Sequence, residues 1–135
     1  MMKTASLTFQ CGGMPILDIE IILKPGEELA PGLARGLADR LGEVFGAAPL
    51  TTWVKVRSIP AEQFAENKMD FAQATYPVFV AVLKTKLPSP EQMPYEISQL
   101  TPLIAHLCSR EPEHVHILYL PEGSGRIAFG GSLQT

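Results

Sequence analysis

The chain has 135 residues, of which 46% are apolar and 19% are charged, and its formal net charge is −3. This size and composition are typical of one globular domain. The weakly acidic balance and the lack of a basic cluster argue against nucleic-acid binding. No apolar run approaches the roughly 20 residues that are needed to span a bilayer, so we expect no membrane segment.

The N-terminal segment MMKTASLTFQCGG lacks the apolar core of a signal peptide. The two cysteines, Cys11 and Cys108, are too few for a disulfide framework or a zinc site. We therefore expect a cytoplasmic protein with no metal and no cofactor.

The first predicted element begins directly after Pro15. Residues 16–23, ILDIEIIL, alternate between apolar and acidic side chains, and this period of two predicts a half-buried strand. Pro25 and Gly26 then predict a turn.

A helix is predicted next, with Glu27 and Glu28 at its N-terminus, Pro31 in its first turn and Gly46 as its stop. A second strand, TTWVKVRSI, follows at residues 51–59 and is closed by Pro60. The helix is recognised by apolar residues at helical spacing: Leu29, Leu33, Leu37, Leu41 and Val44.

The same order of elements is predicted in the second half. VFVAVLK after Pro77 predicts a strand, Ile97 to Leu107 carry a helical apolar pattern, and HVHILYL at residues 114–120 predicts another strand. Pro102 falls inside this helix and is expected to kink it or to mark its true start. A short strand is predicted at residues 127–129 between glycines.

The matched spacing favours an internal duplication. Pro15 and Pro49 are 34 residues apart, and Pro77 and Pro112 are 35 residues apart. We expect an α/β (α+β) fold in which two βαβ units form one four-stranded sheet with two helices on one face. Residues 15–135 would be a single domain with repeat halves at 15–60 and 77–121, preceded by an N-terminal extension at 1–14.

Two helices cover only one face of such a sheet. The strand at residues 78–83 is apolar on both of its faces, which predicts an oligomer whose sheets pack face to face. The uncovered face is predicted to carry the polar strand residues Asp18, Glu20, Trp53, Lys55, Arg57, His114 and His116.

Three segments together resemble the tautomerase superfamily, whose members include 4-oxalocrotonate tautomerase and macrophage migration inhibitory factor. They are MPILDIEII, then APLTTWVKV after one helix, and PEHVHILYLPEG at the end of the second unit. The resemblance extends from Pro15 to about Phe129. It implies a homotrimer with sites at the subunit boundaries.

The resemblance also implies that Pro15 is the catalytic residue. In this family the proline that follows the initiator Met becomes the N-terminus, and its secondary amine acts as a general base in keto–enol or double-bond isomerisation. Burial in an apolar pocket disfavours the charged amine, which brings its pKa toward neutrality. Other members use the proline as an acid in dehalogenation, hydration or decarboxylation.

In the chain as given, Pro15 follows Met14 through a peptide bond, and a peptide nitrogen is not a base. Three accounts are open. Translation starts at Met14, the extension is removed, or the protein has lost proline chemistry and keeps the scaffold.

Four further residues are candidates for substrate binding. Val54 stands where 4-oxalocrotonate tautomerase has a substrate-binding arginine, so Lys55 and Arg57 are the nearest candidates to hold a carboxylate. His116 falls where the inhibitory-factor branch has a tyrosine that reaches into a neighbour's site, and it is a candidate proton donor. Arg126 is a candidate carboxylate clamp. Solvated charges, a structural histidine and a surface arginine are the competing interpretations.

We therefore expect tautomerase-type isomerase chemistry on a small carboxylated keto or enol substrate, provided that Pro15 is freed as the N-terminus. The alternative is a non-catalytic or small-molecule-binding protein of the same fold, in which residues 1–14 mask the proline. His114 and His116 lack a third ligand for zinc, and the glycines around Arg126 lack the pattern of a phosphate loop.

Overall fold

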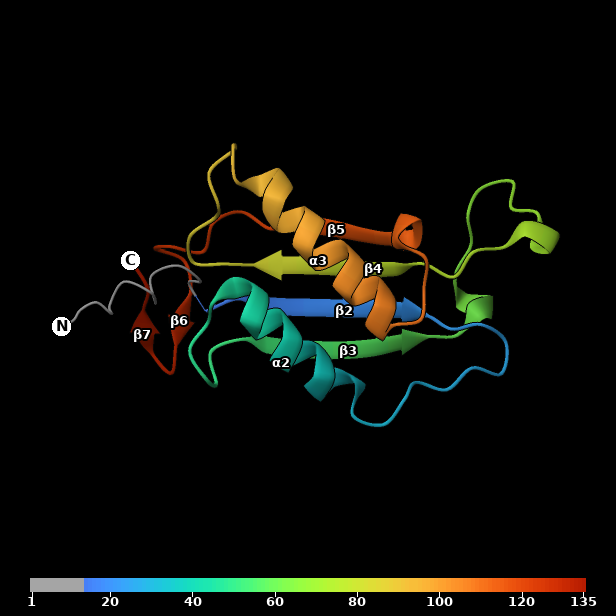
Figure 1. Cartoon of the computed structure of the whole chain (residues 1–135), viewed down its shortest axis with the longest axis horizontal. Coiled ribbons are helices and arrows are strands. Elements are labelled where there is room, and N and C mark those ends of the chain that lie inside the picture. Colours follow the sequence, from blue (N-terminus) through green and yellow to red (C-terminus); the bar gives the residue numbers. More distant parts are fainter. Residues whose placement is uncertain (1–13) are drawn as a thin grey trace.

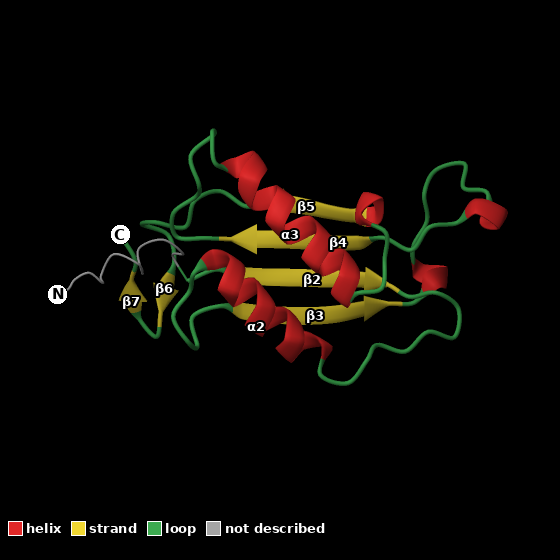
Figure 2. Ribbon diagram, viewed as in Figure 1, coloured by secondary structure: helices red, strands yellow, loops and turns green. Residues whose placement is uncertain are grey.

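A computed structural model describes residues 14–135 of the chain (Figure 1). Cys11 and the rest of the predicted extension, apart from Met14, lie outside the described residues. The fold is α+β: one four-stranded mixed sheet is covered on one face by two helices (Figures 1 and 2). The elements of this layer pair are β2 (Ile16–Ile22), α2 (Leu33–Phe45), β3 (Trp53–Ile59), β4 (Val78–Leu83), α3 (Met93–Leu107) and β5 (Val115–Tyr119).

The strand order β3-β2-β4-β5 confirms the two predicted βαβ units. β2 and β3 are parallel, β4 and β5 are parallel, and β2 and β4 meet antiparallel at the centre of the sheet. The two units therefore run in opposite directions across the central pair. Three short 3₁₀ segments complete the connections, namely η1 (Ala61–Gln63), η2 (Phe71–Gln73) and η3 (Pro112–His114).

The core lies between the sheet and the two helices. Period-2 alternation along β2 and β4 turns one apolar row of each strand toward the helices, and these rows are buried. The helices contribute their apolar stripes to the same layer. The largest fully buried core side chains are Leu17, Ile19, Ile21, Leu37, Leu41, Val78, Val82, Leu100 and Ile104.

The start predicted for the first helix is wrong. α2 begins at Leu33, after Gly32 in the left-handed conformation, and no acidic residue lies in its first turn. Glu27 is instead occupied by tertiary contacts, because it accepts hydrogen bonds from Arg110 and from the backbone N–H of Lys24. Pro31 also disfavours a helical conformation of the residue before it.

Pro102 does not mark the start of the second helix. α3 runs from Met93 to Leu107 with Pro102 inside it, and Pro94 occupies the first turn, where a proline is tolerated. Burial of Leu100 and Ile104 on either side of Pro102 stabilises the continuous helix despite one missing backbone hydrogen bond.

Two further boundaries differ from the predictions. β5 begins at Val115, because His114 belongs to the 3₁₀ turn η3. The predicted strand at residues 127–129 is one arm of a hairpin, in which β6 (Ala128–Phe129) pairs with β7 (Ser132–Leu133). The hairpin contacts the main sheet through Phe129, whose ring centroid lies 5.0 Å from that of Trp53.

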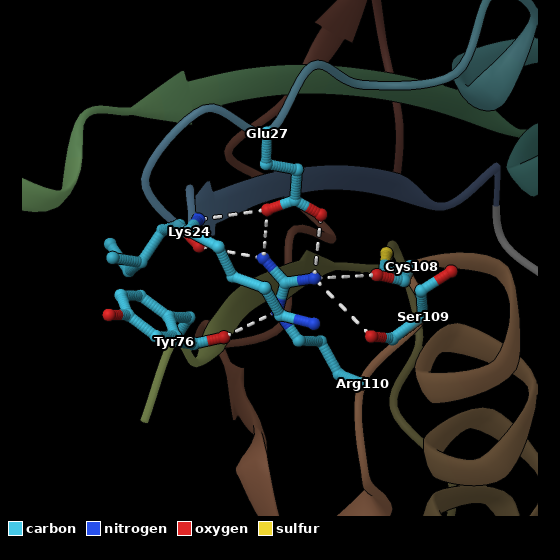
Figure 3. Close-up of polar contacts among 7 residues, drawn as sticks. Lys24, Glu27, Tyr76, Cys108, Ser109 and Arg110 are labelled. Carbon is cyan, nitrogen blue, oxygen red and sulfur yellow. Dashed lines mark hydrogen bonds and ion pairs between the residues drawn. The ribbon is translucent and has the colours of Figure 1, made fainter. Parts of the chain in front are cut away.

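Arg110 ties together one end of the sheet (Figure 3). Its guanidinium donates to both carboxylate oxygens of Glu27, at 2.7 and 2.9 Å, so this pair is bidentate. The remaining N–H groups donate to the backbone carbonyls of Tyr76, Ile22, Cys108 and Ser109. Arg110 thus joins the end of β2, the start of β4 and the end of α3.

Neither α2 nor α3 has both the length and the apolar character that a membrane-spanning helix requires; this statement covers residues 14–135.

Candidate functional site

Pro15 is fully buried and lies directly before the first residue of β2. Its carbonyl accepts a hydrogen bond of 3.0 Å from the backbone N–H of Trp53, so β3 holds the residue in place. Met14 before it has a positive φ of 50°, which is uncommon for a residue other than glycine. In this chain the Pro15 nitrogen is an amide.

The uncovered face of the sheet carries a row of residues, one from each strand, that is polar except for Phe79 on β4; we call it the polar row. The register pairs Arg57 with Glu20, Glu20 with Phe79, and Phe79 with His116. These four residues line an open hollow of about 340 Å³. The structure therefore brings Arg57 and His116 to one surface, as the shared face predicted.

Lys55 and Arg57 are both paired with acidic residues of the neighbouring strand. The ammonium of Lys55 lies 3.2 Å from a carboxylate oxygen of Asp18, and a guanidinium nitrogen of Arg57 lies 2.8 Å from one of Glu20. The Glu20 carboxylate raises the pKa of Arg57, so this side chain stays charged. A substrate carboxylate at either cation would have to compete with these exposed ion pairs, whose net free energy is small.

His116 is exposed, and its ring centroid lies 5.5 Å from that of Phe79. His114 lies in η3 rather than in the strand. In the part of the chain that the structure describes, no group of three or more His, Cys, Asp or Glu side chains is placed to hold a metal ion.

Arg126 lies in the loop that precedes β6. Its guanidinium donates to the backbone carbonyl of Glu122 at 2.6 and 3.2 Å. It therefore stabilises its own loop.

Pro15 and the polar row are not brought together within one subunit. Pro15 is five residues from Glu20 along β2, which corresponds to about 16 Å of extended chain. The alternation of β2 also turns Pro15 to the helix-covered face, with Leu17, whereas Glu20 belongs to the open face.

A second polar cluster, which the sequence analysis did not identify, lies on the face of the sheet that Pro15 shares. Lys84 is only 3% exposed. Its ammonium donates to Glu96 at 2.9 Å and lies 4.9 Å from the ring centroid of Phe45. The hydroxyl of Tyr119 donates to the other oxygen of Glu96 at 2.5 Å. We call the buried Lys84 and its half-buried partners Glu96 and Tyr119 the buried triad.

The buried triad is accessible from one side. Lys84 and Glu96 line a cavity of about 460 Å³ between the end of α2 and the start of α3. Burial, and then the hydrogen bond to Glu96, raise the pKa of Tyr119 far above its ordinary value, so its hydroxyl stays protonated. The sequence held a signal for Lys84: it continues the buried alternation of VFVAVLK by one step.

Comparison with known proteins supports the fold. No protein-family profile and no curated protein matches the sequence. A structure of a fused 4-OT symmetric trimer is 13% identical, covers 88% of this chain and 94% of its own, and has a TM-score of 0.69. A macrophage migration inhibitory factor-like protein from Entamoeba histolytica is 11% identical, with coverages of 89% and 98% and a TM-score of 0.65.

FG41 malonate semialdehyde decarboxylase inhibited by 3-bromopropiolate is also similar, at 14% identity, coverages of 85% and 88% and a TM-score of 0.63. These structures confirm that the chain has the fold of the tautomerase superfamily. At these identities the likeness concerns the fold.

Proposed function

We propose that the protein catalyses tautomerase-type proton transfer on a small carboxylated keto or enol substrate when Pro15 is its N-terminal residue. One observation carries this proposal: Pro15 is fully buried at the start of an interior strand, and its carbonyl is held by Trp53. Removal of the residues before it would turn an amide nitrogen into a secondary amine at a fixed, buried position. Such an amine has a lowered pKa and accepts a proton near neutral pH.

In the proposed reaction the Pro15 amine takes the hydroxyl proton of a dienol. The conjugate acid then returns a proton to carbon, which leaves the ketone. Lys55 or Arg57 would hold the substrate carboxylate, with Arg126 as a further candidate, and His116 of a neighbouring subunit would donate a proton or a polar contact. Because Pro15 and the polar row lie apart within one chain, Arg57 as well as His116 would have to reach the Pro15 site from a neighbouring subunit.

We further propose a cytoplasmic homotrimer. The fused 4-OT structures of similar fold are trimers, one symmetric and one asymmetric. The uncovered sheet face also exposes apolar side chains, with Leu118 63% and Phe79 37% exposed, as is typical of a surface that meets a partner.

The oligomer is tested by light scattering coupled to size-exclusion chromatography. Leu118→Asp should give monomers, because the carboxylate would be buried in the interface without a partner. Tyr95→Asp, at an exposed position on α3, is the matched control and should leave the oligomer intact. A native chain that elutes as a monomer would contradict the trimer.

The catalytic proposal is tested by comparing the full-length chain with a chain that starts at Met14 and loses this Met. Ketonisation of a 2-hydroxydienoate and of phenylenolpyruvate is followed by absorbance. The full-length chain should be no faster than buffer, whereas the chain that begins with Pro15 should accelerate the reaction. In that chain Pro15→Ala should reduce kcat/KM by about 100-fold or more.

A Pro15-first chain that is folded and no faster than buffer would sink the proposal for these substrates. Because a decarboxylase is among the similar structures, malonate semialdehyde belongs in the same substrate panel. Intact mass and N-terminal sequencing of the protein from its native cells would show which N-terminus is present there.

A further inference from the structure

Pro15 lies directly before β2 and Lys84 directly after β4, and the register of these two central strands, continued by one residue, places them opposite each other. The backbone N–H of Ile22 donates to the carbonyl of Pro77 at 3.1 Å, so these two residues form a hydrogen-bonded pair of the antiparallel ladder. Pairs then alternate along the ladder, and one step beyond Ile16 and Leu83 lies the position of Pro15 opposite Lys84. This is a non-hydrogen-bonded position, where the Cα atoms are about 4.5 Å apart and side chains are closest.

Both side chains lie on the helix-covered face. Pro15 follows the alternation of Leu17, and Lys84 follows that of Val82, and all four residues are buried. Desolvated charges interact more strongly than charges in water. The Lys84 side chain therefore begins beside Pro15, and its ammonium is poorly screened.

The buried triad fixes this ammonium. Glu96 of α3 accepts hydrogen bonds from the Lys84 ammonium at 2.9 Å and from the Tyr119 hydroxyl of β5 at 2.5 Å, so the position of its carboxylate is fixed from β5 and from the end of β4. Lys84 donates to no other side chain of the described residues, and the cavity between α2 and α3 reaches it. A lysine with one fixed partner that also lines a cavity can interact with a further group in a functional site.

We propose that Lys84 is a positioning residue of the Pro15 site, and that its buried ammonium keeps the freed proline amine unprotonated near neutral pH. Two like charges at adjacent positions of a dry layer disfavour each other, so the amine loses its proton more readily. This inference rests on the proposed function for the existence of a free amine. It assigns Lys84 no contact with the substrate.

The other groups around this position do not replace Lys84. The neutral Thr52 directly precedes β3, one step beyond the pair of Ile16 and Trp53, and α2 places the neutral ring of Phe45 next to the Lys84 ammonium. Lys86 lies on the exposed rim of the cavity. Other charged or titratable groups at this end of the sheet are Glu96 and Tyr119 of the triad, Glu122 and Arg126 in the loop whose Gly123 donates to the Lys84 carbonyl, the exposed pair Arg40–Glu43 at the end of α2, and Asp18 with Lys55 on the opposite face.

The test is an NMR titration of the proline amine in the chain that begins with Pro15, labelled with ¹⁵N-proline. Both helices, the four strands of the main sheet and the core lie within residues 15–135, and thermal unfolding is first matched to that of the full-length chain. The full-length chain, whose Pro15 nitrogen is an amide, is the blank. Lys84→Met should raise the amine pKa by about one unit, because a cation is lost and Glu96 is left unbalanced.

Lys84→Arg keeps the charge and should leave the amine pKa within about 0.3 units of the native value. Lys86→Met, the same substitution on the exposed rim, is the matched control. It should also leave the amine pKa within about 0.3 units of the native value. If Lys84→Met fails to fold, Lys84→Met with Glu96→Gln removes both charges, and the amine pKa should still rise, by about half a unit.

The proposal is overturned if neither Lys84→Met nor Lys84→Met with Glu96→Gln raises the amine pKa beyond the Lys86→Met control. The titration does not depend on turnover. An amine that titrates as expected in a chain without ketonisation activity would therefore support this inference and contradict the proposed function. A chain that accelerates ketonisation but whose amine pKa does not respond to Lys84→Met would support the proposed function and contradict this inference.

Discussion

The two ends of the sheet each hold a buried basic residue paired with a glutamate, yet the pairs are built differently. At the end where β2 finishes, Arg110 uses every N–H of its guanidinium, on Glu27 and on four backbone carbonyls. At the end where β2 begins, Lys84 donates to Glu96 alone among the described side chains, beside a cavity. Arg110, whose donors are all engaged, stabilises the structure. Lys84, which has one side-chain partner among the described residues, is available to interact with a neighbouring group.

This difference predicts unequal costs when the cations are removed. The largest effect is expected for Arg110→Met, which leaves Glu27 and several carbonyls without their donor. The free energy of unfolding should fall by about 3–5 kcal/mol, measured by urea denaturation. Arg110→Lys should recover only part of this loss, since an ammonium cannot form the bidentate fork. If Arg110→Met lowered the free energy of unfolding by less than Lys84→Met does, the assignment of Arg110 as the structural residue of the two would be wrong.

Glu27→Gln should cost less, about 1–3 kcal/mol at pH 7. The hydrogen bonds from Arg110 lower the pKa of Glu27 below its ordinary value of 4.5. Glu27 therefore stays ionised to a lower pH in the folded chain than in the unfolded chain. This contribution is complete above the unfolded pKa and is lost as the pH falls through the folded value.

Thermal unfolding of the native and Glu27→Gln chains should therefore converge as the pH is lowered below 4.5. A difference between the two chains that stays constant down to pH 3 would show that the ion pair is not its source.

Replacement of the whole Lys84–Glu96 pair should cost still less. Lys84→Met with Glu96→Gln keeps a hydrogen-bond partner for Tyr119 and removes two desolvated charges, so the free energy of unfolding should change by less than about 1 kcal/mol. Urea denaturation of this double variant beside Arg110→Met compares the two ends directly. A loss as large as that of Arg110→Met would make Lys84 a structural residue.

The smallest effect concerns Cys108, which follows α3 next to Arg110. Burial raises the pKa of its thiol to about 11, although Arg110 acts in the opposite direction. In a Cys11→Ser chain, a thiol reagent at pH 8 should react at least about 100-fold more slowly with the folded than with the urea-unfolded protein. Comparable rates would show that this end of the sheet opens readily.

Much of the fold was predictable because its signals are local. The alternation of residues 16–23 and the apolar helical spacing around Leu37 and Leu41 each predict an element from its own residues, and the structure confirms them. The start of α2 was not predictable in this way. Glu27 is a good first-turn residue by local preference, but its partner Arg110 is 83 residues away.

The candidate site shows the same division. Strand alternation correctly placed Arg57 and His116 on one face, but it did not show that ion pairs occupy Lys55 and Arg57. The facing positions of Pro15 and Lys84 depend on the antiparallel register of β2 and β4. That register arises from chain topology, which the alternation of a single strand does not encode.

Pro77 occupies, at the start of β4, a place like that of Pro15 at the start of β2: it is fully buried, and its carbonyl accepts the N–H of Ile22. A circular permutant whose first residue is Pro77 would thus present a proline amine in a similar backbone setting at the opposite end of the sheet. The basic residue there is Arg110, whose donors are all occupied. The pKa of the proline amine in this permutant, compared with that of the Pro15 amine, would separate the contribution of the backbone setting from the contribution of Lys84.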